Sequence, residues 1–171
     1  MKSQPVPFHR LLLAVLLLGA LSSPPGWAAE RVIVIDKNKL LTCPEAPRLQ
    51  EEMLRAINAA RESERTCGSQ HYSPAPPVSW QADLTEAAAE HARDMAAHDF
   101  LSHTGSAGGD LEGRVAKQNY AWGALGENVS GGLATSKEVV AGWLQSPGHC
   151  ANIMKANFKE IGAACARNAE A

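Results

Sequence analysis

The sequence predicts an α+β fold, in which amphipathic helices alternate with short strands. Apolar residues recur at helical spacing in two stretches, one formed by Leu49, Met53, Ile57 and Ala60 and the other running through Leu84 and Met95. Between and after the helices lie short runs of strand-like composition. We expect these strands at residues 78–80, 125–130 and 160–166.

Residues 1–28 have the order of a secretory signal peptide. A basic start precedes an apolar run from Leu11 to Leu21, and helix-breaking residues follow at positions 24–26. The run is shorter than the roughly 20 residues of a membrane span, and no later segment is apolar enough to cross a membrane. We expect cleavage after Ala28 or Ala29 and a protein exported to the periplasm or the exterior, with an uncleaved anchor as the alternative.

The remaining sequence has room for one domain. We assign residues 29–43 to a lead-in, which contains the strand-like run Val32–Ile35, and residues 44–171 to the domain itself. Sixteen basic and 18 acidic residues give a formal net charge of −2. The basic residues are scattered among the acids, so the sequence shows no nucleic-acid footprint.

Helix boundaries can be placed from caps and periodicity. The first helix begins after Cys43-Pro44, presents Arg61 to solvent and fades near Thr66. The second spans residues 82–98, where His91 falls on the apolar stripe and is expected to be a buried structural histidine. Later helices begin after Asp110, after the capping box that starts at Thr135, and at Ser146-Pro147.

Cys43, Cys67, Cys150 and Cys165 form an even set, which in an exported protein favours two disulfides. Four cysteines allow three pairings. We expect Cys43–Cys67 and Cys150–Cys165, because each of these bridges would join the ends of one local unit. A nucleophilic Cys150 beside His149 is the less favoured alternative.

Three polar residues in turn-rich segments are candidates for chemistry: His103, Glu127 and His149. Two imidazoles and a carboxylate brought together could hold a divalent metal or move a proton. However, the two histidines lie 46 positions apart in the sequence, and each could instead satisfy loop backbone groups. No Gly-x-Ser-x-Gly nucleophile elbow occurs, so Ser146 is better explained as a helix cap.

A series of motifs raises the odds that the three residues meet. In order, they are Phe100-Leu-Ser-His-Thr-Gly105, Asp110-Leu-x-x-Arg114, Gly126-Glu-Asn128, Trp143-x-x-Ser146-Pro-Gly-His149-x-x-Asn152 and Glu160-Ile-Gly162. This series resembles the bacterial, SCP-like branch of the CAP superfamily, which comprises cysteine-rich secretory proteins, antigen 5 and pathogenesis-related 1 proteins. The resemblance covers about Leu49 to Ala166.

The resemblance implies a three-layer α-β-α sandwich with a largely antiparallel central sheet. It also implies a cleft lined by His103, Glu127 and His149, with zinc or another divalent ion bound weakly through the two histidines. The second cleft acid of many relatives is missing, since the stretch after Trp143 carries no carboxylate. A C-terminal strand usual in the family is missing too. Either Val32–Ile35 completes the sheet or the domain is shortened.

We therefore expect a ligand-binding or interaction module of the bacterial envelope, with a small ligand, a lipid or a peptide as partner. Two alternatives stay open. One is a metal-assisted, peptidase-like hydrolase, with Glu127 as general base on a metal-bound water. The other is a structural protein stabilised by disulfides. The sequence does not give the oligomeric state.

Overall fold

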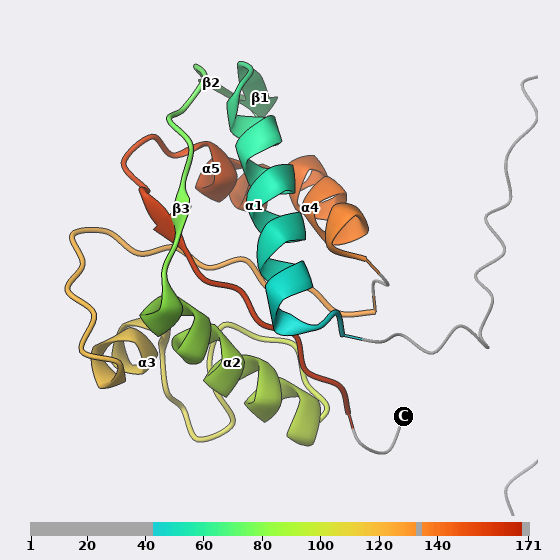
Figure 1. Cartoon of the computed structure of the whole chain (residues 1–171), viewed down its shortest axis with the longest axis vertical. Coiled ribbons are helices and arrows are strands. Elements are labelled where there is room, and N and C mark those ends of the chain that lie inside the picture. Colours follow the sequence, from blue (N-terminus) through green and yellow to red (C-terminus); the bar gives the residue numbers. More distant parts are fainter. Residues whose placement is uncertain (1–42, 133–134, 169–171) are drawn as a thin grey trace, which may run out of the picture. The chain divides into compact units, whose positions relative to one another are not determined.

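The computed structural model describes residues 43–132 and 135–168, so the predicted signal peptide and most of the lead-in, including Val32–Ile35, lie outside the described residues. Helices and short strands are mixed along the chain, which confirms the α+β class (Figure 1). In chain order the elements are α1 Ala46–Arg61, β1 Arg65–Cys67, β2 Gln70–Tyr72, β3 Ser79–Trp80, α2 Ala82–Ala97, α3 Leu111–Lys117, α4 Ser136–Gln145, α5 Pro147–Met154 and β4 Glu160–Ile161.

The strands form two small ladders. β1 and β2 make an antiparallel hairpin that the sequence did not predict, while β3 pairs with β4 in parallel. Of the strand expected over residues 160–166 only β4 forms, and residues 125–130 adopt no strand within the described chain. Residues 125–130 and 162–166 lack a ladder partner among the described residues, so the predicted largely antiparallel central sheet is reduced to these two pairs.

The hydrophobic core lies where α1, α4 and α5 pack together. Met53, Ile57 and Ala60 form the buried stripe of α1, as their spacing predicted. Val140 of α4 and Ile153 of α5 are buried against this stripe. α2 contributes no residue to this cluster, and the segment after β4 runs between α1 and α2 (Figure 1). No helix of the described residues is long and apolar enough to cross a membrane.

Arg61 corrects a prediction, because it is 1% exposed rather than turned to solvent. Its guanidinium donates to four backbone carbonyls at 2.6–3.1 Å, those of Pro76, Ile153, Lys155 and Phe158. The Pro76 carbonyl lies just before β3, whereas the other three lie between the last turn of α5 and the start of β4. A guanidinium group holds its N–H donors in a fixed planar arrangement and can therefore bond several carbonyl oxygens at once. Arg61 thus joins α1 to the residues before β3 and to the segment between the last turn of α5 and β4.

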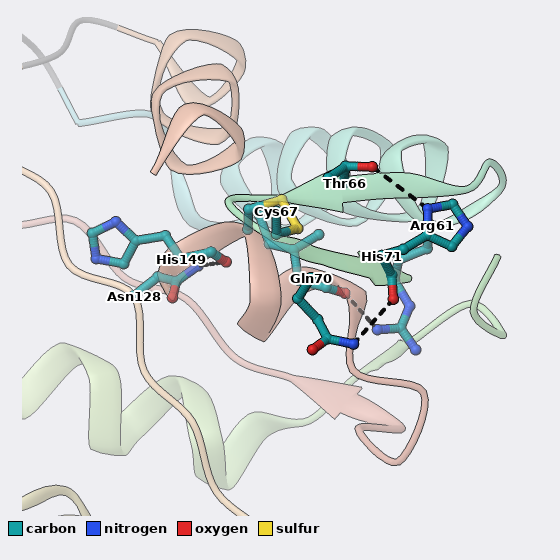
Figure 2. Close-up of a disulfide and its surroundings, with 9 residues drawn as sticks. Arg61, Thr66, Cys67, Gln70, His71, Asn128 and His149 are labelled. Atoms are coloured by element: carbon teal, nitrogen blue, oxygen red, sulfur yellow. Dashed lines mark hydrogen bonds between the residues drawn. A yellow bond between two sulfur atoms is a disulfide. The ribbon is translucent and has the colours of Figure 1, made fainter. Parts of the chain in front are cut away.

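The predicted disulfide pairing is wrong. The bridges are Cys43–Cys165 and Cys67–Cys150, rather than Cys43–Cys67 and Cys150–Cys165. Figure 2 shows the second bridge, which joins β1 to α5. The cysteines of each local unit face different neighbours, because the β1–β2 hairpin packs on α5 while the residues before α1 meet the segment after β4.

Candidate functional site

The loop from Asp99 to Asp110 carries His103 and is fixed to α2. His91, which is 2% exposed as predicted, places its Nε2 2.7 Å from the Ser102 carbonyl oxygen. A carbonyl only accepts, so Nε2 must carry the proton. Asp94 accepts from the Ser106 hydroxyl at 2.6 Å and from the Ser106 N–H at 2.7 Å. These hydrogen bonds hold the pKa of the Asp94 carboxyl below its ordinary value.

Arg114 holds the same loop from α3. Its side chain donates to the His103 carbonyl and to the Gly109 carbonyl at 3.3–3.4 Å. The same guanidinium donates to Glu127 Oε2 at 2.6 Å, and the residue is only 5% exposed. Asp110, the predicted cap, begins α3 by accepting from the Gly113 N–H. Arg114 therefore connects the loop of His103 to the segment of Glu127.

His103 and Glu127 meet directly. His103 Nδ1 lies 2.6 Å from Glu127 Oε1, and the imidazole is exposed while the carboxylate is largely covered. Because the carboxylate accepts, Nδ1 carries the proton, and in the neutral ring Nε2 keeps its lone pair. Glu127 therefore orients His103, with both of its oxygens already accepting short hydrogen bonds.

Asparagine side chains tie His149 to the same region. Asn152 donates to the Glu127 carbonyl at 3.1 Å and to Asn128 Oδ1 at 3.0 Å. Asn128 then donates to the His149 carbonyl at 3.1 Å. The imidazole of His149 points away from the Cys67–Cys150 bridge (Figure 2) and lies 6.5 Å from the Trp143 ring, centroid to centroid.

The structure thus brings His103 and Glu127 into contact and links His149 to them through its backbone. Arg114, Asn128 and Asn152 organise the site, although none of the three was predicted to be a site residue. All three belong to the motifs that carry the family resemblance. Their place in these motifs was the signal in the sequence that could have identified them as site residues.

Comparison with known proteins decides the family. The model of the cysteine-rich secretory protein family, CAP, matches residues 54–171. The chain belongs to the CAP family. A crystal structure of an extracellular protein containing an SCP domain, from Bacillus anthracis strain Ames, has the same fold. Its TM-score is 0.63 at 21% sequence identity, over 71% of this chain and 38% of that one.

Two curated proteins of Bacillus subtilis strain 168 share sequence with this CAP domain. The uncharacterized protein YkwD is 29% identical over 86 residues, which cover 50% of this chain and 34% of YkwD. The uncharacterized membrane protein YlbC is 26% identical over 85 residues, which cover 50% of this chain and 25% of YlbC. The matched region thus spans only a quarter to a third of these relatives.

The donor set of the CAP site is too small for a three-ligand metal centre. Among the described residues, no group of three or more His, Cys, Asp or Glu side chains could hold a metal ion. The Glu127 carboxylate already pairs with Arg114 and His103. Such bonding is typical of a residue that orients a metal-binding histidine, rather than of a residue that binds the metal itself. His103 and His149 are the two donors that the sequence analysis assigned to a metal ion, and this assignment stays a prediction.

The CAP domain also contains a cavity of about 1240 Å³ bounded by α1, α2 and the segments 125–130 and 162–168. Its walls are the apolar faces of the two helices, including Met53, Ile57, Leu84 and Met95, and Glu127 belongs to its lining. Leu101 and Trp122, the two large hydrophobic side chains that are exposed among the described residues, line it as well. Neither His103 nor His149 lines this cavity, so the histidines and the apolar space are neighbouring features that share Glu127.

Proposed function

We propose that this CAP domain is an exported binding module that takes an elongated apolar ligand, with an acyl chain as the preferred type, in the cavity between α1 and α2. The observation that carries the proposal is the size and apolar lining of this cavity. Pockets for drug-sized ligands occupy about 300–1,000 Å³, and this one is larger. The exposed Leu101 and Trp122 extend its apolar surface.

Three of the charged side chains in the lining are already bonded within the protein, which supports an apolar ligand. Arg61 is bonded to carbonyls, Glu127 is bonded to Arg114 and His103, and Glu160 accepts from the Tyr120 hydroxyl at 2.5 Å. That last hydrogen bond raises the pKa of Tyr120 to about 12. These three charged groups are already satisfied by the protein. An uncharged chain would therefore leave none of them unpaired.

Export is supported by the cysteines, because all four are in disulfides and such bridges persist in oxidising compartments. The hydrolase alternative has less support. Both oxygens of Glu127 already accept short hydrogen bonds from charged or imidazole donors, whereas a general base needs to reach the proton that it removes. Binding is therefore the function that the geometry supports best.

Binding can be tested with a fluorescent long-chain fatty acid as the probe. Ala92→Trp would place a large ring on the cavity-lining face of α2, and we expect it to weaken probe affinity at least tenfold. Ala97→Trp is the matched control, because Ala97 is exposed on the same helix and outside the lining. No saturable binding by the wild type, or equal affinities for both variants, would remove the proposal. If an apolar peptide bound the cavity and the fatty-acid probe did not, the ligand would be a peptide rather than an acyl chain.

A separate prediction concerns metal. With two imidazoles as donors, we expect at most weak, reversible zinc binding, lost in the His103→Ala/His149→Ala double variant. Calorimetric titration of both proteins measures it. Equal heats for wild type and double variant would show that the two histidines share no metal site. Glu127→Gln, which keeps the shape of the side chain, should weaken zinc binding only through the orientation of His103.

A further inference from the structure

We propose that the Cys43–Cys165 disulfide is a redox-sensitive latch that controls access to the cavity between α1 and α2. The segment it holds, Gly162–Arg167, is called the strap below. Every residue of the strap lines the cavity, and so does Cys43 on the other side of the bridge. The inference rests on the proposed function only for the identity of this cavity as the ligand site.

The strap is firmly fixed at its start. Gln81 N–H donates to the Ile161 carbonyl at 2.8 Å, next to the β3–β4 ladder. Gly162 then lies so close to α2 that a Cβ atom there would be 2.1 Å from the Thr85 nitrogen and 2.3 Å from the Leu84 carbonyl carbon. The chain can approach α2 this closely only because Gly162 has no side chain.

Beyond Gly162 the strap is held much more lightly. No backbone–backbone hydrogen bond within the described chain involves residues 162–167. The side chains of Ala163, Ala164 and Ala166 are single methyl groups, which bury little apolar area. The covalent bond from Cys165 to Cys43, just ahead of α1, therefore provides the strongest restraint on this end of the strap.

The two disulfides differ in their accessibility to a thiol. Cys165 is exposed and Cys43 is partly exposed, whereas Cys67 is 5% and Cys150 0% exposed. Thiol–disulfide exchange requires a thiolate to reach a sulfur atom. The latch is therefore open to attack in the folded protein, while the bridge between β1 and α5 is shielded by the core.

The reaction is a two-electron exchange with a dithiol reductant. A thiolate of the dithiol attacks the Cys165 sulfur, the bond to Cys43 breaks, and Cys43 leaves as a thiolate that takes up a proton. The second thiol of the reductant then attacks the mixed disulfide and releases Cys165. The reductant ends as a disulfide, the protein holds two thiols, and the strap loses its covalent bond to Cys43.

The test uses the mature exported protein and limiting dithiothreitol at neutral pH. Alkylation followed by peptide mapping should label Cys43 and Cys165 at least tenfold faster than Cys67 and Cys150. Under the same conditions, hydrogen exchange of residues 163–167 should speed up at least tenfold, while buried amides of α1 and α5 keep their protection. Simultaneous labelling of all four cysteines, or unchanged exchange in the strap after selective reduction, would overturn the latch.

The acyl probe separates this inference from the proposed function. Selective reduction should change the association rate of the probe several-fold, and Cys43→Ser/Cys165→Ser should behave like the reduced protein. If the double variant fails to fold, chemical reduction still gives the answer. Equal probe kinetics in both redox states would refute control of access while leaving binding intact. A strap that opens while neither state binds the probe would refute the proposed function but not the redox-sensitive strap.

Discussion

Arg114 is the buried residue on which the candidate site depends most. It neutralises Glu127 and also holds the loop of His103 through two carbonyl groups. Without it, a largely covered carboxylate would lose its charged partner, and the loop would lose its tie to α3. The stability of the domain and the orientation of His103 are therefore coupled through one side chain.

Arg114→Met should lower the free energy of unfolding by about 3–5 kcal/mol, because it leaves one partner of a buried ion pair uncompensated. Urea denaturation measures the loss. Lys117→Met is a matched control on the same helix, since the Lys117–Glu90 pair is exposed and such pairs contribute about 0–1 kcal/mol. If the two variants lose the same stability, Glu127 does not depend on Arg114.

Among the elements, the β3–β4 pair determines how α2 meets the rest of the domain. Only two residues of each strand pair, Ser79 with Glu160 and Trp80 with Ile161. The contact continues at Gly162, where the backbone touches the first turn of α2. Such a short ladder has few hydrogen bonds, so the close packing at Gly162 carries much of the attachment.

Gly162→Ala should therefore destabilise the protein by about 1–3 kcal/mol, the usual cost of forcing atoms into a packed contact. Gly123→Ala is the control, because a Cβ atom there would meet nothing within 4 Å. Both changes reduce the freedom of the unfolded chain in the same way, so their difference in urea denaturation isolates the contact. A Gly162→Ala variant as stable as Gly123→Ala would show that β4 can move away from α2.

At the scale of the whole molecule, sequence patterns predicted what is local. The spacing of Met53, Ile57 and Ala60 predicted the buried face of α1, and the position of His91 on an apolar stripe predicted its burial. Likewise, Asp110 caps α3 as expected. Each of these depends on neighbours within one or two helical turns, where periodicity and capping chemistry act.

What the sequence did not reveal is long-range. Arg61 looked like a solvated charge at a helix end, yet three of its carbonyl partners lie more than 90 residues further along the chain. Among the described residues, the strand expected at 125–130 does not form, and the one expected at 160–166 forms only at 160–161. The reason is similar, because a strand needs a partner that its own composition cannot specify. At the site, the motifs indicated that His103 and Glu127 meet, but not that Glu127 would orient the histidine.

The disulfides close two nested loops, with sequence separations of 122 for Cys43–Cys165 and 83 for Cys67–Cys150. In the chain-entropy model a loop of this length stabilises the fold by about 4–5 kcal/mol. Nested loops share residues, so the two contributions do not simply add. Together the bridges join the beginning of the described domain to its end.

This nesting affects the order in which the bonds can form. A chain that is made and exported from its N-terminus presents Cys43 and Cys67 to the oxidant well before Cys150 and Cys165 emerge. The first bond open to it is therefore the non-native one between Cys43 and Cys67. Where that bond forms, reaching the native pairs requires reshuffling, and we expect a disulfide isomerase to speed maturation beyond the rate with an oxidant alone.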